Sequence, residues 1–164
     1  MNVKKRRATK ANNSTAKQIR ANERHRKEKY IKLIADNFHN GDFFFSLFSN
    51  KNLTIAENKK IMKNFMRRFR REYESRTMEK IKFFRILNTG IKHNAPCAYM
   101  LVPAFADRTI IKGIMNYLWL DGLVKVDIYN GTPQELSLIS SCFCRQNEKE
   151  PLPKIDISRG NFRL

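Results

Sequence analysis

The residues with the clearest chemical potential in this sequence are a thiol and a phenol, at Cys97 and Tyr99. They belong to the second of two apolar runs, Ile81–Leu87 and Cys97–Val102, which are rich in aromatic and β-branched residues and are separated by a connection that contains glycine and proline. Such runs predict adjacent antiparallel strands, and alternate residues of a strand share one face. Because a thiol can supply a nucleophile or a metal ligand, this pair is the first candidate for a reactive site.

The other thiols and imidazoles do not form a recognisable metal site. The cysteines are too few for a disulfide framework and are typical of a reducing compartment: Cys97, Cys142 and Cys144. The spacing of the last two is not that of a zinc ribbon, and the histidines are scattered at His25, His39 and His93. We therefore predict no metal and no other cofactor from these residues.

The net charge is the strongest general indication of function. The 164 residues include 33 Lys and Arg against 15 Asp and Glu, which gives a formal charge of +18. This length suits one folded domain with appendages, and this charge predicts a polyanionic partner, with nucleic acid ahead of a membrane surface. No run approaches the ~20 apolar residues of a transmembrane helix, and no apolar segment follows the charged N-terminus. We expect a cytoplasmic protein without a membrane partner.

Two basic segments precede the domain. Residues 1–19 have almost no large apolar side chain and predict a disordered basic arm. We expect this arm to bind nucleic-acid phosphates, and the alternative is that it serves only as a solubilising tail or a localisation signal. Residues 20–40 predict a basic N-terminal helix whose first half is too polar for a core and whose second half docks on the domain. The candidates for nucleic-acid phosphate contact in these segments are Lys4, Lys5, Arg6, Arg7, Arg20 and Arg24.

A longer helix is predicted to begin at Thr54, because Thr54 and Glu57 have the spacing of a capping box. Apolar residues recur at helical spacing from Ile61 to Tyr73 and predict a buried stripe, and the opposite face is basic. An ordinary solvated face, which is the alternative, would carry interspersed acids, and these are absent here until residue 72. The candidates for phosphate binding on this face are Lys59, Lys63, Arg67, Arg70 and Arg71.

The remaining pattern predicts one α+β domain over residues 41–145. Beside the helix and the two strands already described, it contains strands at 42–49 and 123–129 and helices at 104–121 and 134–143. This order is typical of a ferredoxin-like split β-α-β antiparallel sheet, here with an added N-terminal basic helix and a C-terminal helix. Trp119 is expected in the core, and residues 146–164 are expected to form an extended, loosely held tail.

Four segments match the pattern of a known family: GDFFFSLFS before a basic helix, FFRILNTGIKHNAPCAYMLVP, YLWLDGLVKVDIY and PQELSLISSCF. With them the chain from about Phe43 to Leu164 resembles the replication-associated (Rep) proteins of rolling-circle plasmids and phages, the histidine-hydrophobic-histidine endonucleases. The resemblance implies the ferredoxin-like sheet. It also implies an enzyme that holds Mg²⁺ or Mn²⁺ with two histidines and an acidic or amide residue, and that attacks single-stranded DNA with a tyrosine.

Other residue types occupy the family's catalytic positions here. The resemblance places the two histidines on Cys97 and Tyr99, the acidic residue on Asn88, the tyrosine on Ile139 and a following lysine on Cys142. A thiol and a neutral phenol are poor ligands for a hard cation, and Ile139 carries no nucleophile. We therefore expect no catalytic residue, no bound metal and no nicking activity.

The expected function is that of a nucleic-acid-binding Rep-like protein of a plasmid or phage, accessory to DNA replication or regulating it. Its partner would be single-stranded or hairpin DNA, held by the arm, the basic helix and the sheet face of Cys97 and Tyr99, where aromatic side chains could stack on bases. Two alternatives stay open. One is an active rolling-circle initiator with an atypical site, and the other is a phage-encoded inhibitor that engages RNA, a ribonucleoprotein or an acidic protein. The partner could also be a replication or ribonucleoprotein complex.

Overall fold

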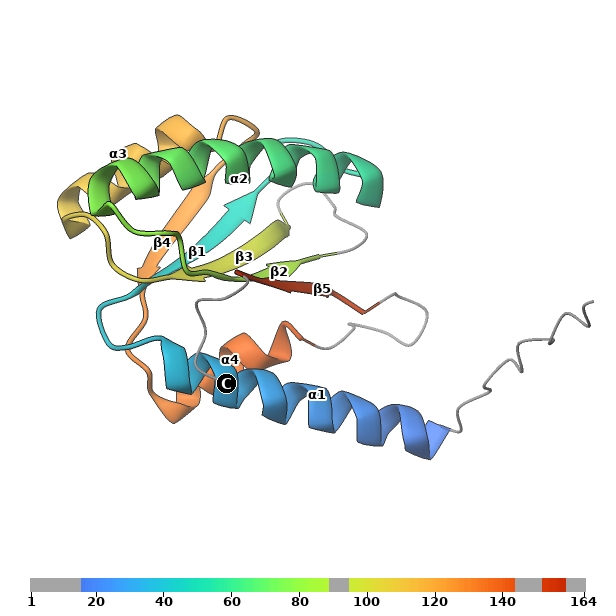
Figure 1. Ribbon diagram of the computed structural model, residues 1–164. Helices are drawn as coiled ribbons and strands as arrows, with labels where there is room; N and C mark the ends of the chain where they lie inside the picture. Colours follow the sequence, from blue (N-terminus) through green and yellow to red (C-terminus); the bar gives the residue numbers. More distant parts are fainter. Residues whose placement is uncertain (1–15, 89–94, 144–151, 159–164) are drawn as a thin grey trace, which may run out of the picture.

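The computed structural model describes residues 16–88, 95–143 and 152–158 and shows an α+β protein, which confirms the α+β part of the predicted fold (Figure 1). In chain order, its elements are α1 Ala16–Asn37, β1 Phe43–Phe48, α2 Ile55–Thr77, β2 Phe84–Leu87, β3 Pro96–Val102, α3 Arg108–Leu118, β4 Val124–Ile128, α4 Pro133–Ser141 and β5 Lys154–Ile157. The helices and the first four strands follow the predicted order.

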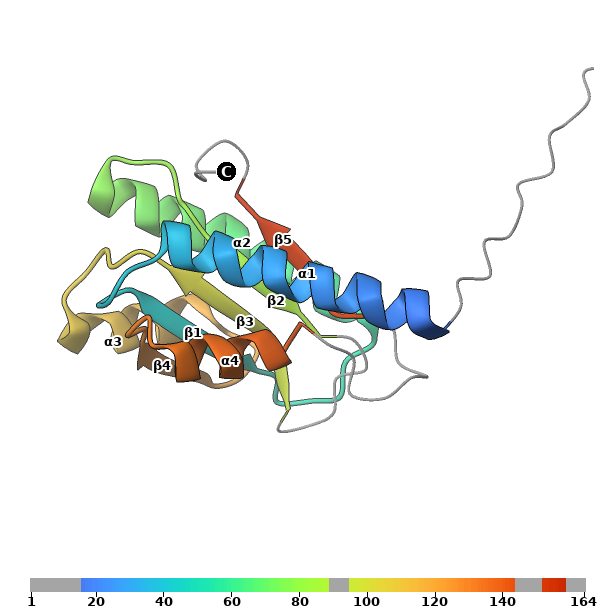
Figure 2. The same cartoon turned by 90° about the horizontal axis from the view of Figure 1, so that it is seen from below.

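The strands of the described chain form one five-stranded antiparallel sheet in the order β4-β1-β3-β2-β5. Helices α2 and α3 cover one face of this sheet, and α1 and α4 cover the other (Figure 1, Figure 2). The sheet is therefore the middle of three layers, and both of its faces are packed against helices.

Alternation along β1 divides its side chains between two cores. The first core lies between the sheet and helices α2 and α3, and its members include Phe43, Phe45, Leu47, Phe65, Phe69, Met115 and Trp119. The second core lies between the sheet and helices α1 and α4, and consists of Leu33, Ile34, Phe38, Phe84, Ile86, Leu101, Tyr129, Ile139 and Phe143. The second half of α1 thus packs on the domain. Trp119 is 1% exposed, which confirms the prediction of a core position.

The end of the chain departs from the sequence analysis. Within the predicted loose tail, Lys154–Ile157 forms an edge strand that pairs with β2, and the partly buried Ile155 and Ile157 pack against the second core. Residues 144–151 and 159–164 lie outside the described residues, as do residues 1–15 of the arm predicted at 1–19. The prediction is wrong for residues 16–19, which form the first turn of α1 because the helix begins at Ala16. Two further elements are shorter than predicted, since β2 begins only at Phe84 and α3 begins after Asp107, whose carboxylate caps it.

The Gly122→Ala substitution is expected to destabilise the protein. A β-carbon on Gly122 would overlap the backbone oxygen of Phe48, which already accepts a hydrogen bond from the Trp119 indole at 2.9 Å. The backbone cannot move away easily, because Phe48 N–H also donates to the Leu123 carbonyl at 2.8 Å. We expect a loss of about 1–3 kcal/mol or more in the free energy of unfolding, measured by urea denaturation.

Gly113→Ala is the matched control for this prediction. Gly113 is exposed in the middle of α3, and a β-carbon there would meet nothing within 4 Å. Because alanine has the higher helix propensity, this variant should gain about 0.5–1 kcal/mol. The same direction of change in both variants would contradict the close packing of Gly122 on β1.

Candidate nucleic-acid interface

Helix α2 begins with the predicted capping box, which is confirmed. The Thr54 hydroxyl accepts a hydrogen bond from Glu57 N–H at 3.2 Å, and the Glu57 carboxylate accepts one from Thr54 N–H at 2.8 Å. These bonds to Thr54 hold the pKa of Glu57 below its ordinary value. The helix then runs for 23 residues, and its buried side is formed by Asn58, Met62, Phe65, Met66, Phe69 and Tyr73.

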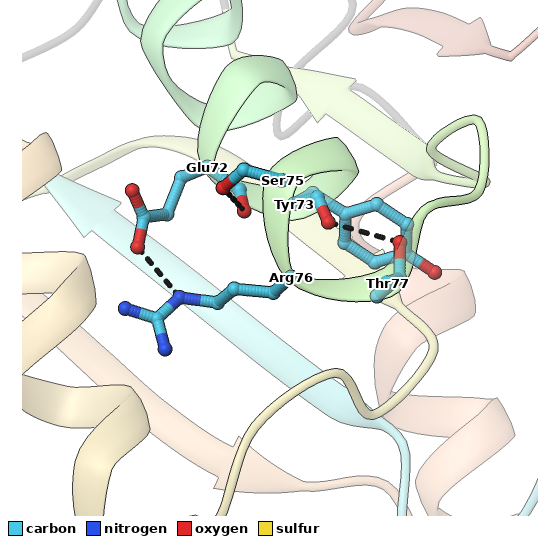
Figure 3. A network of polar contacts seen from close by, with 5 residues as sticks. All are labelled: Glu72, Tyr73, Ser75, Arg76 and Thr77. Carbon is cyan, nitrogen blue, oxygen red and sulfur yellow. Dashed lines mark hydrogen bonds and ion pairs between the residues drawn. The ribbon is translucent and has the colours of Figure 1, made fainter.

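The opposite side of α2 is a row of exposed cations, which we call the α2 basic face: Lys59, Lys60, Lys63, Arg67, Arg70 and Arg71. None of the ion pairs formed among the described residues includes any of these six side chains. The nearest acid along the helix, Glu72, instead pairs with Arg76 at 2.6 Å in the last turns (Figure 3). The positive charge of this face is therefore left for another partner.

The last turns of α2 are held by bonds within the helix itself (Figure 3). The Ser75 hydroxyl donates to the Glu72 carbonyl at 2.9 Å, and the Thr77 hydroxyl donates to the Tyr73 carbonyl at 2.9 Å. Arg68, which lies outside the basic face, donates through Nε and Nη2 to the Leu118 carbonyl at the end of α3. The basic face is thus displayed on a helix that is fixed at both ends.

A groove of about 610 Å³ lies between α2 and the strands β2 and β5, and we call it the α2–β5 groove. Five cations of the α2 basic face line it, together with Arg85 of β2 and Lys154 of β5, and Glu74 is the acid among its lining residues. A second hollow of about 490 Å³ shares Met66, Arg70, Glu74 and Arg85 with the groove and reaches Asp156 of β5. The basic face therefore borders a concave surface that is also strongly cationic.

Arg85 is a candidate residue that the sequence analysis missed. It lies in the apolar strand β2 opposite Met100, a member of the first core, so its side chain faces the α2 side of the sheet. Its Nη2 donates to the Asp156 carboxylate at 2.5 Å, and its side chain is 10% exposed. Burial lowers the pKa of Arg85, while Asp156 opposes this shift. The feature of the sequence that could have identified Arg85 is that it is a single arginine within an apolar strand.

The structure separates the other predicted cations from α2. Arg20 and Arg24 are exposed on α1. This helix packs on the opposite face of the sheet from α2 (Figure 1). The Arg24 side chain lies 3.8 Å from the Glu28 carboxylate. Lys4, Lys5, Arg6 and Arg7 lie outside the described residues. The five candidates of α2 line the α2–β5 groove, and Arg20 and Arg24 do not.

The prediction that Cys97 and Tyr99 share one face of β3 is wrong. Leu47 of β1 pairs with Ala98, and Phe48 pairs with Pro96, so Cys97 is the extra residue of a β-bulge. The Cys97 side chain therefore lies in the first core, while Tyr99 packs against the second core. Because α1 and α4 cover the Tyr99 side, this face of the sheet is not the open base-stacking surface that was expected.

Both side chains are neutral at neutral pH. Burial raises the pKa of Cys97 to about 12, and its thiol donates to the Leu47 carbonyl at 3.2 Å. Burial also raises the pKa of Tyr99 to about 12, and the neighbouring Cys142 side chain adds to the rise. A protonated thiol and a phenol on opposite sides of a strand do not fit the Mg²⁺ or Mn²⁺ that the resemblance implies.

The remaining family positions have structural contacts. Asn88 donates through its side chain to the Pro96 carbonyl at 2.8 Å, and the buried Asn58 of α2 donates to the carbonyls of both Asn88 and Cys97. Ile139 is buried in the second core, and Cys142 caps the end of α4. Tyr99 and Cys142 are neighbours in the structure. In contrast, the backbone carbonyls of Asn88 and Cys97 are hydrogen-bonded to Asn58 of α2. No group of three or more His, Cys, Asp and Glu within the described ranges could hold a metal ion.

Comparisons with protein-family models, with curated proteins and with solved structures find no match to this chain. Among the described helices, none is both long and apolar enough to cross a membrane. The function must therefore be inferred from the chain's own residues, and the α2 basic face with its groove is the strongest feature for that purpose.

Proposed function

We propose that the protein binds nucleic acid through the α2 basic face and the α2–β5 groove, as a Rep-like protein of a plasmid or phage that lacks nicking activity and is accessory to DNA replication or regulates it. The observation that carries this proposal is the row of six exposed cations on one fixed helix, none of which is ion-paired within the described chain. A polyanion supplies the missing negative charge.

The spacing of the α2 basic face suits a nucleic-acid backbone. Lys59 and Arg71 are twelve positions apart in the sequence, which corresponds to about 18 Å along a helix. One strand of B-form DNA advances about 3.4 Å per phosphate, so this length spans about five phosphates. Contacts of this kind position a strand and do not read its sequence, which favours binding by charge and shape.

The ferredoxin-like arrangement is part of this proposal. The connections β1–α2–β2 and β3–α3–β4 form two β-α-β units, and in the sheet β1 lies between β4 and β3 while β3 lies between β1 and β2. The two units therefore interleave, as a split β-α-β sheet requires. In this interpretation α1, α4 and β5 are additions to the shared fold.

Binding should depend strongly on salt. We expect single-stranded DNA of ~16 nucleotides to bind with a slope of log affinity against log salt concentration of about −3 to −4, which corresponds to about five phosphate contacts. Fluorescence anisotropy at several salt concentrations measures this slope. Hairpin DNA and RNA of equal length are compared in the same titrations. If none of the three binds at low salt, a protein or ribonucleoprotein partner replaces this proposal.

Nicking is the activity that we expect to be absent. Supercoiled plasmid and single-stranded DNA incubated with the protein and Mg²⁺ or Mn²⁺ should stay intact, because Cys97 and Tyr99 are neutral and on opposite sides of β3. Denaturing gels measure both strand breaks and covalent protein–DNA adducts, with EDTA reactions as the control for background breakage. A metal-dependent adduct would instead establish an active initiator, and Tyr99→Phe and Tyr129→Phe variants would then test each phenol as its nucleophile.

A further inference from the structure

Arg85 has more hydrogen-bonding capacity than its surroundings use. A guanidinium has five N–H donors, and here Nη2 donates to Asp156. The Nε and Nη1 atoms of Arg85 are shielded from solvent and have no hydrogen-bond partner among the described residues. Since buried donors are normally satisfied, and more so when they are charged, these two atoms mark a place where an acceptor is missing.

The charges around Arg85 also favour an added anion. Asp156 balances a single positive charge, while Arg70 and Lys154 line the same groove and have no ion pair within the described chain. The charge of Arg70 adds to the lowering of the Arg85 pKa, after burial as the main cause. A neighbouring anion would remove this repulsion.

We propose that one phosphate group of the bound nucleic acid enters the α2–β5 groove and accepts hydrogen bonds from Arg85, with Arg70 and Lys154 beside it. This inference rests on the proposed function and deepens it by naming one residue and one chemical group. The planar guanidinium fork matches two phosphate oxygens. The side chains of Met66 and Arg70 line both hollows beside Arg85, and in this proposal they move aside so that the buried Nε and Nη1 atoms reach the phosphate.

A purely structural role for Arg85 makes a different prediction. Arg85 and Asp156 are direct partners in the pairing of β2 with β5, so their ion pair could serve only to hold the edge strand. In that case, removal of either charge would have the same effect. If Arg85 binds phosphate, however, the Asp156 carboxylate competes with the ligand, and its removal should strengthen binding.

The test compares Arg85→Gln, Arg85→Lys and Asp156→Asn in the full chain, with a fluorescent oligo(dT) of ~16 nucleotides as the probe. We expect Arg85→Gln to weaken binding about 10- to 100-fold and to reduce the salt slope by about 0.7. Arg85→Lys keeps the positive charge but lacks the planar guanidinium, so its affinity should lie between those of the wild type and Arg85→Gln. Asp156→Asn should bind up to about five-fold tighter. Thermal unfolding of each variant separates these effects from loss of fold.

The outcomes distinguish this inference from the proposed function. If Arg85→Gln binds like the wild type, or if Asp156→Asn is weakened as much as Arg85→Gln, the inference is wrong, and the α2 basic face can still bind nucleic acid. If no oligonucleotide binds, the proposed function fails, and inorganic phosphate then probes the groove alone. A shift of the Arg85 Nε–H signal in ¹⁵N NMR on addition of phosphate supports the site, and an unchanged signal overturns it.

The chemical group at the 5′ end of the oligonucleotide shows whether the bound phosphate is an internal phosphodiester or a terminal phosphate. The same oligonucleotide is compared with a 5′-hydroxyl and with a 5′-phosphate. If Arg85→Gln weakens both forms equally, the groove takes an internal phosphodiester. If it weakens only the 5′-phosphorylated form, the groove takes a terminal phosphate, whose higher charge suits the excess of cations there.

Discussion

A variant in which Lys63, Arg67 and Arg71 are all changed to alanine is expected to bind single-stranded DNA about 500-fold more weakly than the wild type at ~50 mM salt, and about 50-fold more weakly at ~150 mM. These three exposed cations follow one another at intervals of four residues along α2 and line the α2–β5 groove. Each lost phosphate contact removes the release of about 0.7 counterion, so the salt slope should also become smaller by about 2.

The control for this variant removes the same charge elsewhere. Lys29 and Lys32 on α1 and Lys112 on α3 are exposed and do not line the α2–β5 groove, and their triple alanine variant keeps the α2 basic face intact. Anisotropy titrations of both variants, at matched salt, measure the difference. Equal weakening would mean that net charge, and not the α2 basic face, accounts for binding. Circular dichroism should show both variants folded, since alanine is a strong helix former.

The Phe69→Ala substitution should lower the free energy of unfolding by about 3–5 kcal/mol. Phe69 is fully buried in the first core, and its ring lies 5.6 Å from those of Phe65 and Phe105 and 6.2 Å from that of Phe45. Removing it leaves a cavity between α2 and the sheet, at the point where the helix that carries the basic face is attached. A loss of this size is a large part of the ~5–15 kcal/mol that stabilises a typical domain.

Thermal and urea unfolding measure this effect. For a chain of this length we expect the midpoint of thermal unfolding to fall by about 6–20 °C. Leu138→Ala is the control, because Leu138 on α4 is 71% exposed and its truncation should change the stability by no more than about 0.5 kcal/mol. Similar effects of both substitutions would contradict the tight packing of α2 on the sheet.

Local patterns in the sequence were sufficient for the order of the elements and for the two faces of α2. The capping box of Thr54 and Glu57 and the apolar recurrence up to Tyr73 depend on residues three or four positions apart. Contacts at such short separations are fixed by helix geometry itself, whatever the helix packs against. The same periodicity placed the cations Lys59 to Arg71 on the outer side, where the structure has them.

The positions of Cys97 and Tyr99 could not be derived in this way. Strand alternation predicts one shared face, but the register of β3 against β1 inserts a bulge at Cys97, and this register depends on residues about fifty positions away in the chain. A single extra residue exchanges the two sides of a strand from that point on. The first candidate for a reactive pair was therefore separated by tertiary pairing alone.

The sequence by itself thus determined the fold class, the order of helices and strands up to α4, and the chemical character of α2, because these follow from short-range periodicity and composition. Only the tertiary structure decided that Lys154–Ile157 completes the sheet, that Arg85 and Asp156 meet from positions 71 residues apart, and that a cationic groove lies between α2 and this edge. The physical reason is that strand pairing and helix docking join distant segments, whose meeting leaves no pattern in either segment alone.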